Sequence, residues 1–373
     1  MNFDFTDKQR VIQRVAREFT EREIEPIAEQ VDRDCVIPFE MIKKMAQVGL
    51  FGMKVPPKYG GSEAGTLAYT LAMEQLGYAA SACDSIVLTN NNLTELICAF
   101  GTEQQKQKYV PQLCAGEGVA SRMFTEPSTG SDPKAIATTA VPDKDHYIIN
   151  GNKRFATHSP LDGPAIIYAK DETGRVSAFL IEKNCEGYST SKPWDLLGLR
   201  GQMTADVTLN NVRVPKNNLF GPKGDGMKIL FSMIGAGRIG ICARLLGLCQ
   251  AARDEAIKYA KQRTVRDRPI AQMQTIQWLL SEIESRLEAA RWLTYRVAFL
   301  AEQGEPPREE GAIAKLFVSR TAVEISNMAL QVHGGYGYTK EFKVERIYRN
   351  AKYGEIVEGV SEIQRSIIAS ALI

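Results

Sequence analysis

The chain has 373 residues, of which 44% are hydrophobic and 24% charged, and its 46 basic and 44 acidic residues leave a formal net charge of +2. This composition excludes a disordered chain, and the balanced charge excludes a nucleic-acid surface built on overall basicity. No apolar run reaches the ~18 residues of a membrane span, and we expect neither a signal peptide nor a nucleic-acid partner.

The first third of the chain has helical periodicity. Thr6 and Gln9 form a capping-box pair ahead of the first helix, and Pro26 predicts an irregularity further along. Apolar patterns predict further helices at 39–48, 66–78, 85–100 and 103–113. We therefore predict an N-terminal helical domain over residues 1–118.

The middle of the chain has a different pattern, with short β-type runs separated by turn-rich pieces. These runs lie at 146–150, 165–169, 176–181 and 205–209. Because no helical pattern separates them, they favour an antiparallel sheet or small barrel, and we predict a β-barrel domain over residues 119–225. From about Gly226 long apolar stripes at helical spacing return, and they predict a helix bundle over residues 226–373. The fold class is α+β, in the order α, β, α.

One glycine motif suggests a dinucleotide site but lacks the necessary context. Gly235, Gly237 and Gly240 match GxGxxG, and an acidic residue follows at about the right distance. A Rossmann fingerprint needs a strand, a helix and a second strand, whereas residues 241–261 have the pattern of one uninterrupted helix. We therefore interpret these glycines as small residues that let neighbouring segments approach the helix closely.

Two long segments carry a family resemblance. The segment from Phe124 to Asp132 reads FTEPSTGSD, and the segment from Gln331 to Tyr338 reads QVHGGYGY. They resemble the TEPxxGSD and QxxGGxG signatures of the acyl-CoA dehydrogenases, and the C-terminal Glu358-Gly359 also matches that family. The resemblance extends over essentially the whole chain. It implies a helical N-terminal domain, a middle β-barrel and a C-terminal four-helix bundle, with FAD between barrel and bundle in a homotetramer or homodimer.

The chemistry implied by the resemblance needs a base. Desaturation of an acyl thioester removes a proton from Cα and a hydride from Cβ, and a glutamate in a dry pocket suits the proton transfer. Glu358 matches the family's catalytic glutamate. Some relatives carry the base just before a matching arginine, but here that position is Gly237, ahead of Arg238. Arg238 itself matches an arginine near the acyl-CoA site, and an ordinary structural arginine is an equally good interpretation.

Other residues match cofactor contacts of the family. Phe124, Thr125, Phe155 and Thr157 match residues around the flavin ring, and Ser131 matches one near the pyrophosphate and the CoA moiety. The matched contacts at the other end of the cofactor, including two to a neighbouring subunit's FAD, are Arg263, Gln274, Gln331 and Gly335. Each also has an ordinary explanation, since such residues make turns, barrel cores and helix ends without a ligand.

The chain also departs from the family pattern. Arg266 stands near where the family usually has an adenine-stacking Phe, and Val360 replaces a frequent threonine. Asp84 and the asparagines at 90–92 fall in the segment that borders the acyl pocket by resemblance. Glutaryl-type relatives have an arginine about where Cys83 stands. Asp84 and the asparagines either meet a polar or cyclic acyl group or serve only the fold, and the sequence leaves both open.

We therefore expect an FAD-dependent acyl-CoA dehydrogenase that passes electrons to an electron-transfer flavoprotein. The alternatives are a same-fold oxidase, monooxygenase or enoyl-CoA reductase, or a scaffold that binds flavin or CoA without catalysis. Seven cysteines without a CxxC pair and only three histidines favour reduced thiols and no metal site. We expect a bacterial cytoplasmic protein or, as a second possibility, a processed mitochondrial matrix form.

Overall fold

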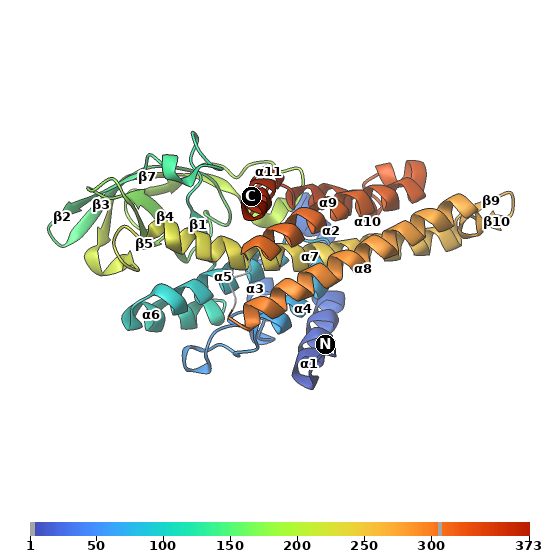
Figure 1. Ribbon diagram of the computed structural model, residues 1–373, viewed down its shortest axis with the longest axis horizontal. Helices are drawn as coiled ribbons and strands as arrows, with labels where there is room; N and C mark the ends of the chain where they lie inside the picture. Colours follow the sequence, from blue (N-terminus) through green and yellow to red (C-terminus); the bar gives the residue numbers. More distant parts are fainter. Residues whose placement is uncertain (1–3, 305–307) are drawn as a thin grey trace.

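The computed structural model describes residues 4–304 and 308–373. The molecule is elongated, with a β-rich region at one end and two long helices, α7 and α8, that extend to the other end (Figure 1). The first helices pack below these long helices, and the C-terminal helix lies next to the β-rich region. The predicted order of helical, β and helical regions is confirmed. The predicted limits at residues 118 and 225 stay predictions.

The N-terminal region begins with the predicted cap. The Thr6 side chain accepts from Gln9 N, and the Gln9 side chain accepts from Thr6 N, so two orphan donors are satisfied together. A π-helical turn at Thr20–Ile24 and a 3₁₀ turn at Glu25–Ile27 then form the irregularity predicted from Pro26. The helices of this region are α1 (Asp7–Phe19), α2 (Ala28–Asp34), α3 (Phe39–Gln47), α4 (Thr66–Gly77), α5 (Asp84–Phe100) and α6 (Glu103–Cys114).

The middle region is one eight-stranded sheet. Its strands are β1 (Ser121–Met123), β2 (Thr139–Asp143), β3 (His146–Ala156), β4 (Pro164–Lys170), β5 (Val176–Glu182), β6 (Tyr188–Thr190), β7 (Ala205–Pro215) and β8 (Leu219–Phe220). The strand order is β6-β7-β3-β2-β4-β5-β8, so β6 and β8 end the ladder. Most pairs are antiparallel as predicted, but β1 joins β4 in parallel, with Arg122 opposite Ile166. Since β1 is only three residues long, no periodicity reveals it in the sequence.

The C-terminal region is a bundle of long helices. Its elements are α7 (Gly226–Gln262), the hairpin β9 (Thr264–Val265) and β10 (Arg268–Pro269), α8 (Gln274–Glu302), α9 (Arg308–His333), α10 (Lys343–Tyr353) and α11 (Ser361–Leu372). The GxGxxG segment lies inside α7, which confirms that it opens no βαβ unit. Among the helices of residues 4–304 and 308–373, α7 is the one long and apolar enough to pass as a membrane helix, yet 72% of its most apolar window is buried inside the protein. It is the central helix of the fold.

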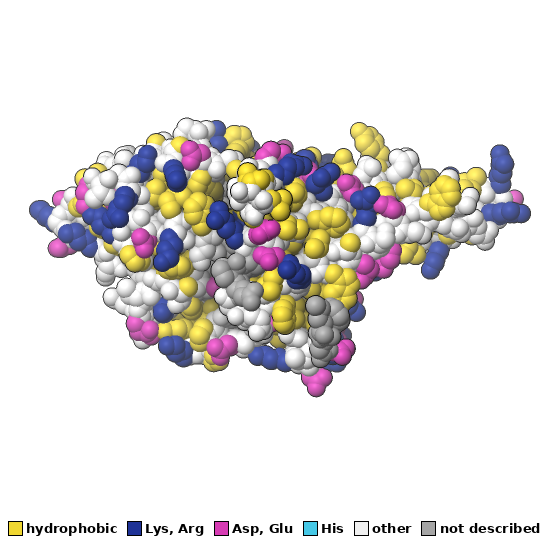
Figure 2. Space-filling model, viewed as in Figure 1, with side chains coloured by type: hydrophobic (Ala, Val, Ile, Leu, Met, Phe, Trp, Pro, Cys, Tyr) yellow, Lys and Arg dark blue, Asp and Glu magenta, His cyan; other side chains and the backbone are white. Residues whose placement is uncertain are grey.

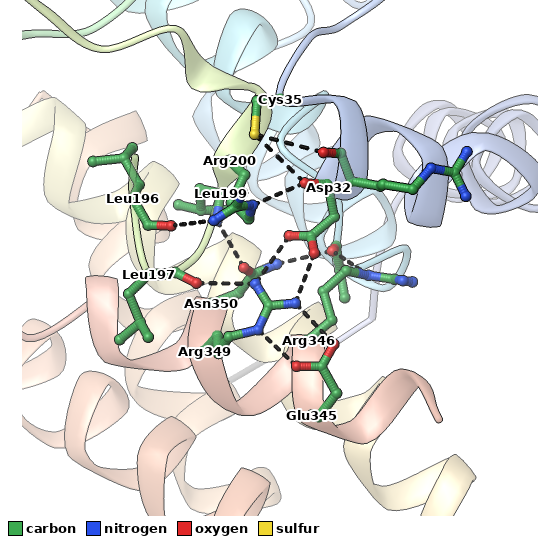
Figure 3. A network of polar contacts seen from close by, with 12 residues as sticks. Asp32, Cys35, Leu196, Leu197, Leu199, Arg200, Glu345, Arg346, Arg349 and Asn350 are labelled. Atoms are coloured by element: carbon green, nitrogen blue, oxygen red, sulfur yellow. Dashed lines mark hydrogen bonds and ion pairs between the residues drawn. The ribbon is translucent and has the colours of Figure 1, made fainter. Parts of the chain in front are cut away.

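A polar network joins the three regions. Arg349 on α10 binds both carboxylate oxygens of Asp32 on α2, at 3.0 and 2.7 Å, and also binds Glu345 and the Leu197 carbonyl (Figure 3). Next to it, Asn350 accepts from Leu199 N at 2.8 Å and donates to a carbonyl of the N-terminal region. The network fixes the loop after β6 against helices from both ends of the chain.

Candidate active site

Glu358 lies in the turn between α10 and α11, and the turn holds it in an unusual conformation. Its φ is +52°, in the left-handed region that a side chain with a Cβ seldom occupies, and Gly359 follows with φ +90°. Gln364 donates to the Glu358 carbonyl at 3.1 Å and to the Gly359 carbonyl at 2.7 Å. Lys315 also donates to the Gly359 carbonyl, at 2.7 Å. Lys315 on α9 and Gln364 on α11 therefore hold the turn that carries Glu358.

The Glu358 carboxylate is buried and faces a guanidinium across the junction of sheet and bundle. Arg122 on β1 donates to its two oxygens at 2.7 and 3.3 Å, and the Glu358 side chain is only 4% exposed. On its other side the carboxylate touches the bare backbone of α7. A Cβ built on Gly237 would lie 2.7 Å from the carboxyl carbon and 2.9 Å from each oxygen, so only glycine leaves room there.

Two further cations act on the same carboxylate. Arg238, one residue after Gly237, is buried, and its Nε has no hydrogen-bond partner. Lys315 is fully buried, and burial lowers its pKa to about 8 although Cys242 and Glu358 act in the opposite direction. Burial and desolvation would lower the pKa of Arg122, but the attraction of Glu358 raises it overall. The Glu358 carboxylate therefore has three cationic side chains around it.

Several buried hydroxyls near this carboxylate lack partners. The Tyr69 and Tyr168 hydroxyls make no hydrogen bond among the described residues. Burial raises the pKa of both, and the negative charge of Glu358 adds to the rise. In the loop before β7, the Gln202 Oε1 and Thr204 Oγ1 atoms also have no hydrogen-bond partner among the described residues, although no contact joins them to Glu358. Since buried polar atoms usually have partners, such a group of orphaned atoms marks a place where a ligand supplies the hydrogen bonds.

The four residues matched to the flavin ring lie along β1, β3 and the segments that follow them. Thr125 is half-buried, and its carbonyl accepts from Arg154 N at 2.8 Å, which ties the two segments together. Phe155 is 54% exposed with φ +53°, and its ring lies 5.6 Å from that of Trp194. Phe124 and Thr157 are half-buried nearby in the chain. Exposed aromatic surface and orphaned polar atoms suit a flat heteroaromatic ring, so these residues fit a flavin.

Ser131 lies in the exposed loop after β1. The loop is anchored by Glu126, whose buried carboxylate accepts from Lys153 at 2.8 Å and from Thr138 N at 3.0 Å. Glu126 of the TEPxxGSD segment is therefore a structural anchor within the described chain. Its partners are 12 and 27 residues away, which is why the motif alone did not indicate this role.

The remaining matched residues lie at the far end of the bundle. Arg263 follows α7 directly and its guanidinium lies 5.8 Å from the Tyr336 ring, in the 3₁₀ turn that contains Gly335. Gln274, Gln331 and Gly335 are exposed. Figure 2 shows basic side chains gathered at this end, over the β9–β10 hairpin. Thr125 follows β1 and Phe155 lies in β3, whereas the β9–β10 hairpin is at the end of the molecule away from the β-rich region (Figure 1). One chain therefore does not bring the two sets of residues together.

The polar residues beside the expected acyl pocket have different surroundings. Asn90 and Asn91 hydrogen-bond buried backbone groups, including Gly118 O at 3.1 Å and Leu50 O at 2.8 Å, so they serve the fold. Asp84 is buried and pairs with Arg244 at 2.7 Å, and burial raises the pKa of its carboxyl to about 6. Asp84 and Arg244 line a cavity of about 10 Å³, which is room for roughly one water. The cavity includes Ile241, one helical turn beyond Gly237.

Sequence reasoning missed Arg122, Lys315 and Tyr69. Arg122 stands three residues before Thr125, where the TEPxxGSD match begins, and its short strand gave no sequence signal for it. Its partner is 236 residues away, so the pairing required the fold.

Comparisons with known proteins agree with these observations. The profiles of the acyl-CoA dehydrogenase N-terminal, middle and C-terminal domains match residues 6–117, 121–212 and 224–373. The 3-(aryl)acrylate reductase of Clostridium sporogenes is 41% identical over 374 residues, 99% of each chain. A subunit of the caffeyl-CoA reductase–Etf complex of Acetobacterium woodii is 36% identical, again over 99% of each chain. The structure of butyryl-CoA dehydrogenase from Megasphaera elsdenii superposes with a TM-score of 0.96 at 33% identity over the full length of both chains.

Proposed function

Because the chain belongs to the acyl-CoA dehydrogenase family, we propose that it interconverts an acyl-CoA and its 2-enoyl-CoA, with Glu358 as the proton-transfer group. FAD, when bound, exchanges a hydride with Cβ of the acyl group. Glu358 moves the proton between its carboxylate and Cα. The observation that carries the proposal is the buried Glu358 carboxylate at the junction of sheet and bundle. We assign Ser131 and Arg238 to the CoA thioester.

The flavin would be held by residues of two chains. Phe124, Thr125, Phe155 and Thr157 would contact the ring from the sheet. Arg263 and Gln274 flank the β9–β10 hairpin, at the end of the bundle away from the β-rich region. Gln331 and Gly335 lie at the end of α9 and in the turn after it. We propose that all four serve the cofactor of a neighbouring subunit. We therefore propose a homodimer or homotetramer.

We propose an electron-transfer flavoprotein as the redox partner. The support is a relative that is named as a subunit of a reductase–Etf complex. The bacterial origin of both relatives described above supports a bacterial cytoplasmic location.

The test replaces the base. In Glu358→Gln, bleaching of the flavin by acyl-CoA without oxygen should slow by roughly 10²- to 10⁴-fold, the usual contribution of a positioned acid or base, while the flavin stays bound. The matched control is Glu362→Gln, the same substitution four residues later, where the side chain is 76% exposed. Fast bleaching in Glu358→Gln would move the base elsewhere on the chain.

A second candidate function is net reduction of an activated C=C bond. It is favoured by the names of two relatives, a 3-(aryl)acrylate reductase and a caffeyl-CoA reductase subunit. The two directions use the same atoms, so the distinction lies in which one the site favours. Exposure of the reduced enzyme to oxygen separates both from an oxidase, since only an oxidase turns over rapidly with oxygen.

A further inference from the structure

The pair between Arg122 and Glu358 joins two separate parts of the fold. Arg122 comes from β1 of the sheet, and Glu358 from the α10–α11 turn of the bundle. Both carboxylate oxygens accept from the guanidinium, at 2.7 and 3.3 Å. The bidentate form is the strongest arrangement of such a pair, and it is largely withdrawn from water.

The guanidinium has no other partner. Within residues 4–304 and 308–373, Glu358 is the only acceptor of its hydrogen bonds, although a guanidinium carries five N–H donors. The Arg122 side chain is 26% exposed. Arg122 therefore does not belong to a larger structural network among the described residues. One carboxylate, that of Glu358, balances its positive charge.

The other charged groups around Glu358 have the same sign as Arg122. Arg238 and Lys315 are both buried and both act electrostatically on Glu358. A negative carboxylate neutralises part of this charge. If Glu358 lost its charge, the Arg122 guanidinium, whose side chain is 26% exposed, would lose its partner among the described residues, and loss of one partner of a largely desolvated pair is costly.

Proton transfer to carbon therefore differs from its reverse in this site. In the reductive direction the O–H bond of protonated Glu358 breaks and a C–H bond forms at Cα. The π bond is consumed as Cβ takes up a hydride, which a bound reduced flavin would supply, and a reduced electron-transfer flavoprotein would restore the two electrons. Glu358 becomes an anion in this step and gains its ion pair with Arg122. In the oxidative direction it loses that pair.

We propose that Arg122 biases the bound reactants toward the saturated acyl group, so that the site is built for reduction of a 2-enoyl group. This inference rests on the proposed function, and it names the direction that one residue favours. Arg122 acts through Glu358 and is a positioning residue. It changes the equilibrium between the bound complexes and leaves that of the free substrates unchanged.

The test measures the bound equilibrium from both sides. Oxidised holoenzyme is mixed with saturating butyryl-CoA, and reduced holoenzyme with saturating crotonyl-CoA, without oxygen, and flavin absorbance is read when it stops changing. We expect the wild type to end mostly oxidised from either side. Arg122→Met should shift the ratio of reduced to oxidised flavin upward by about 10-fold or more, since close charge pairs commonly couple this strongly.

Matched variants separate charge from packing. Arg122→Lys keeps the charge and should stay near the wild-type ratio, and Arg122→Gln should follow Arg122→Met if that variant does not retain flavin. Arg213→Met removes an exposed arginine of the same sheet and should change nothing. A further readout needs no turnover. The infrared band of a neutral carboxyl can be assigned to residue 358 if it is absent in Glu358→Gln. That band should be stronger in Arg122→Met than in the wild type.

The outcomes distinguish the two proposals. If no acyl-CoA or enoyl-CoA changes the flavin colour in the wild type, the proposed function fails. If colour responds but Arg122→Met and Arg122→Gln keep the wild-type ratio, or shift it toward oxidised flavin, the function stands and the role of Arg122 is overturned.

Discussion

Arg349 and Arg122 each bind a carboxylate far away in the sequence, and they differ in how fully they are satisfied. Arg349 makes five hydrogen bonds, to Asp32, Glu345 and the Leu197 carbonyl (Figure 3). Arg122 makes two, both to Glu358. Glu358 acts electrostatically on the orphaned Tyr69 and Tyr168 hydroxyls, whereas the five bonds of Arg349 use all five N–H donors of its guanidinium.

The difference indicates what each pair does. A fully satisfied network has one arrangement and holds the segments that it joins, because any movement breaks several bonds together. A pair with unused donors beside unpaired hydroxyls retains hydrogen-bonding capacity for a ligand. We therefore infer that the first pair is structural, and we propose that the second takes part in the reaction. The following changes test this division.

Removal of Arg349 should have the largest effect on stability. Arg349→Met leaves two largely buried carboxylates without their partner, and loss of one partner of a buried pair costs about 3 kcal/mol in the free energy of unfolding. Urea unfolding measures this loss. Turnover per folded, flavin-loaded molecule should stay within about twofold of the wild type. A large fall in turnover at unchanged stability would contradict the division.

Gly237→Ala should have the opposite signature. Its Cβ would lie 2.7 Å from the carboxyl carbon of Glu358, so the carboxylate must move, and a displacement of this order lowers turnover by roughly 10²-fold. Gly235→Ala is the matched control, since nothing lies within 4 Å of its Cβ position. Both substitutions replace a glycine inside α7. The free energy of unfolding of the control should therefore rise by up to about 1 kcal/mol, and its turnover should not fall. Equal turnover in the two variants would place Glu358 outside the reaction.

Lys315 should contribute a smaller, pH-dependent effect. Burial lowers its pKa to about 8, below the 10.5 of a free lysine, so the unfolded chain binds more protons between these values. The free energy of unfolding should therefore rise with pH from about 8 to about 10.5, and Lys315→Met should lack this part of the rise. Urea titrations of both proteins at several pH values measure the difference. Parallel curves for the two proteins would show that Lys315 titrates normally.

An exposed pair should have the smallest effect. Arg213 and Asp143 join β7 and β2 at 3.3 Å, with side chains 56% and 43% exposed. Arg213→Met should change the free energy of unfolding by less than about 1 kcal/mol, because water screens such pairs. Thermal unfolding at low and high salt measures it, and a loss as large as that in Arg349→Met would show that number of partners does not separate the classes.

Local features of this fold were predictable from the sequence. The Thr6–Gln9 cap, the irregularity at Pro26 and the unbroken α7 depend on residues a few positions apart. Glu358 was predicted because its motif matched a known family. The site assignments at Phe124, Thr125, Phe155 and Thr157 stay predictions, although their surroundings fit a flavin.

Long-range features were not predictable. The partner of Arg122 is 236 residues away, and that of Arg349 is 317 residues away on α2. A single sequence contains no signal for such pairs, since neither periodicity nor composition depends on them. The parallel β1–β4 ladder was missed for the same reason, because its strands are separated by about 40 residues and one is very short.

Gly237 is a second position in the chain from which a glutamate could place its carboxyl group where that of Glu358 lies. The Cβ and carboxyl carbon of any glutamate are about 2.5 Å apart, close to the 2.7 Å between a Cβ at 237 and the carboxyl carbon of Glu358. A glutamate rooted in α7 would thus deliver its acid to the point that the C-terminal turn now reaches. The same point is therefore within reach of a glutamate on the C-terminal turn, as in this chain, and of a glutamate at position 237 of α7.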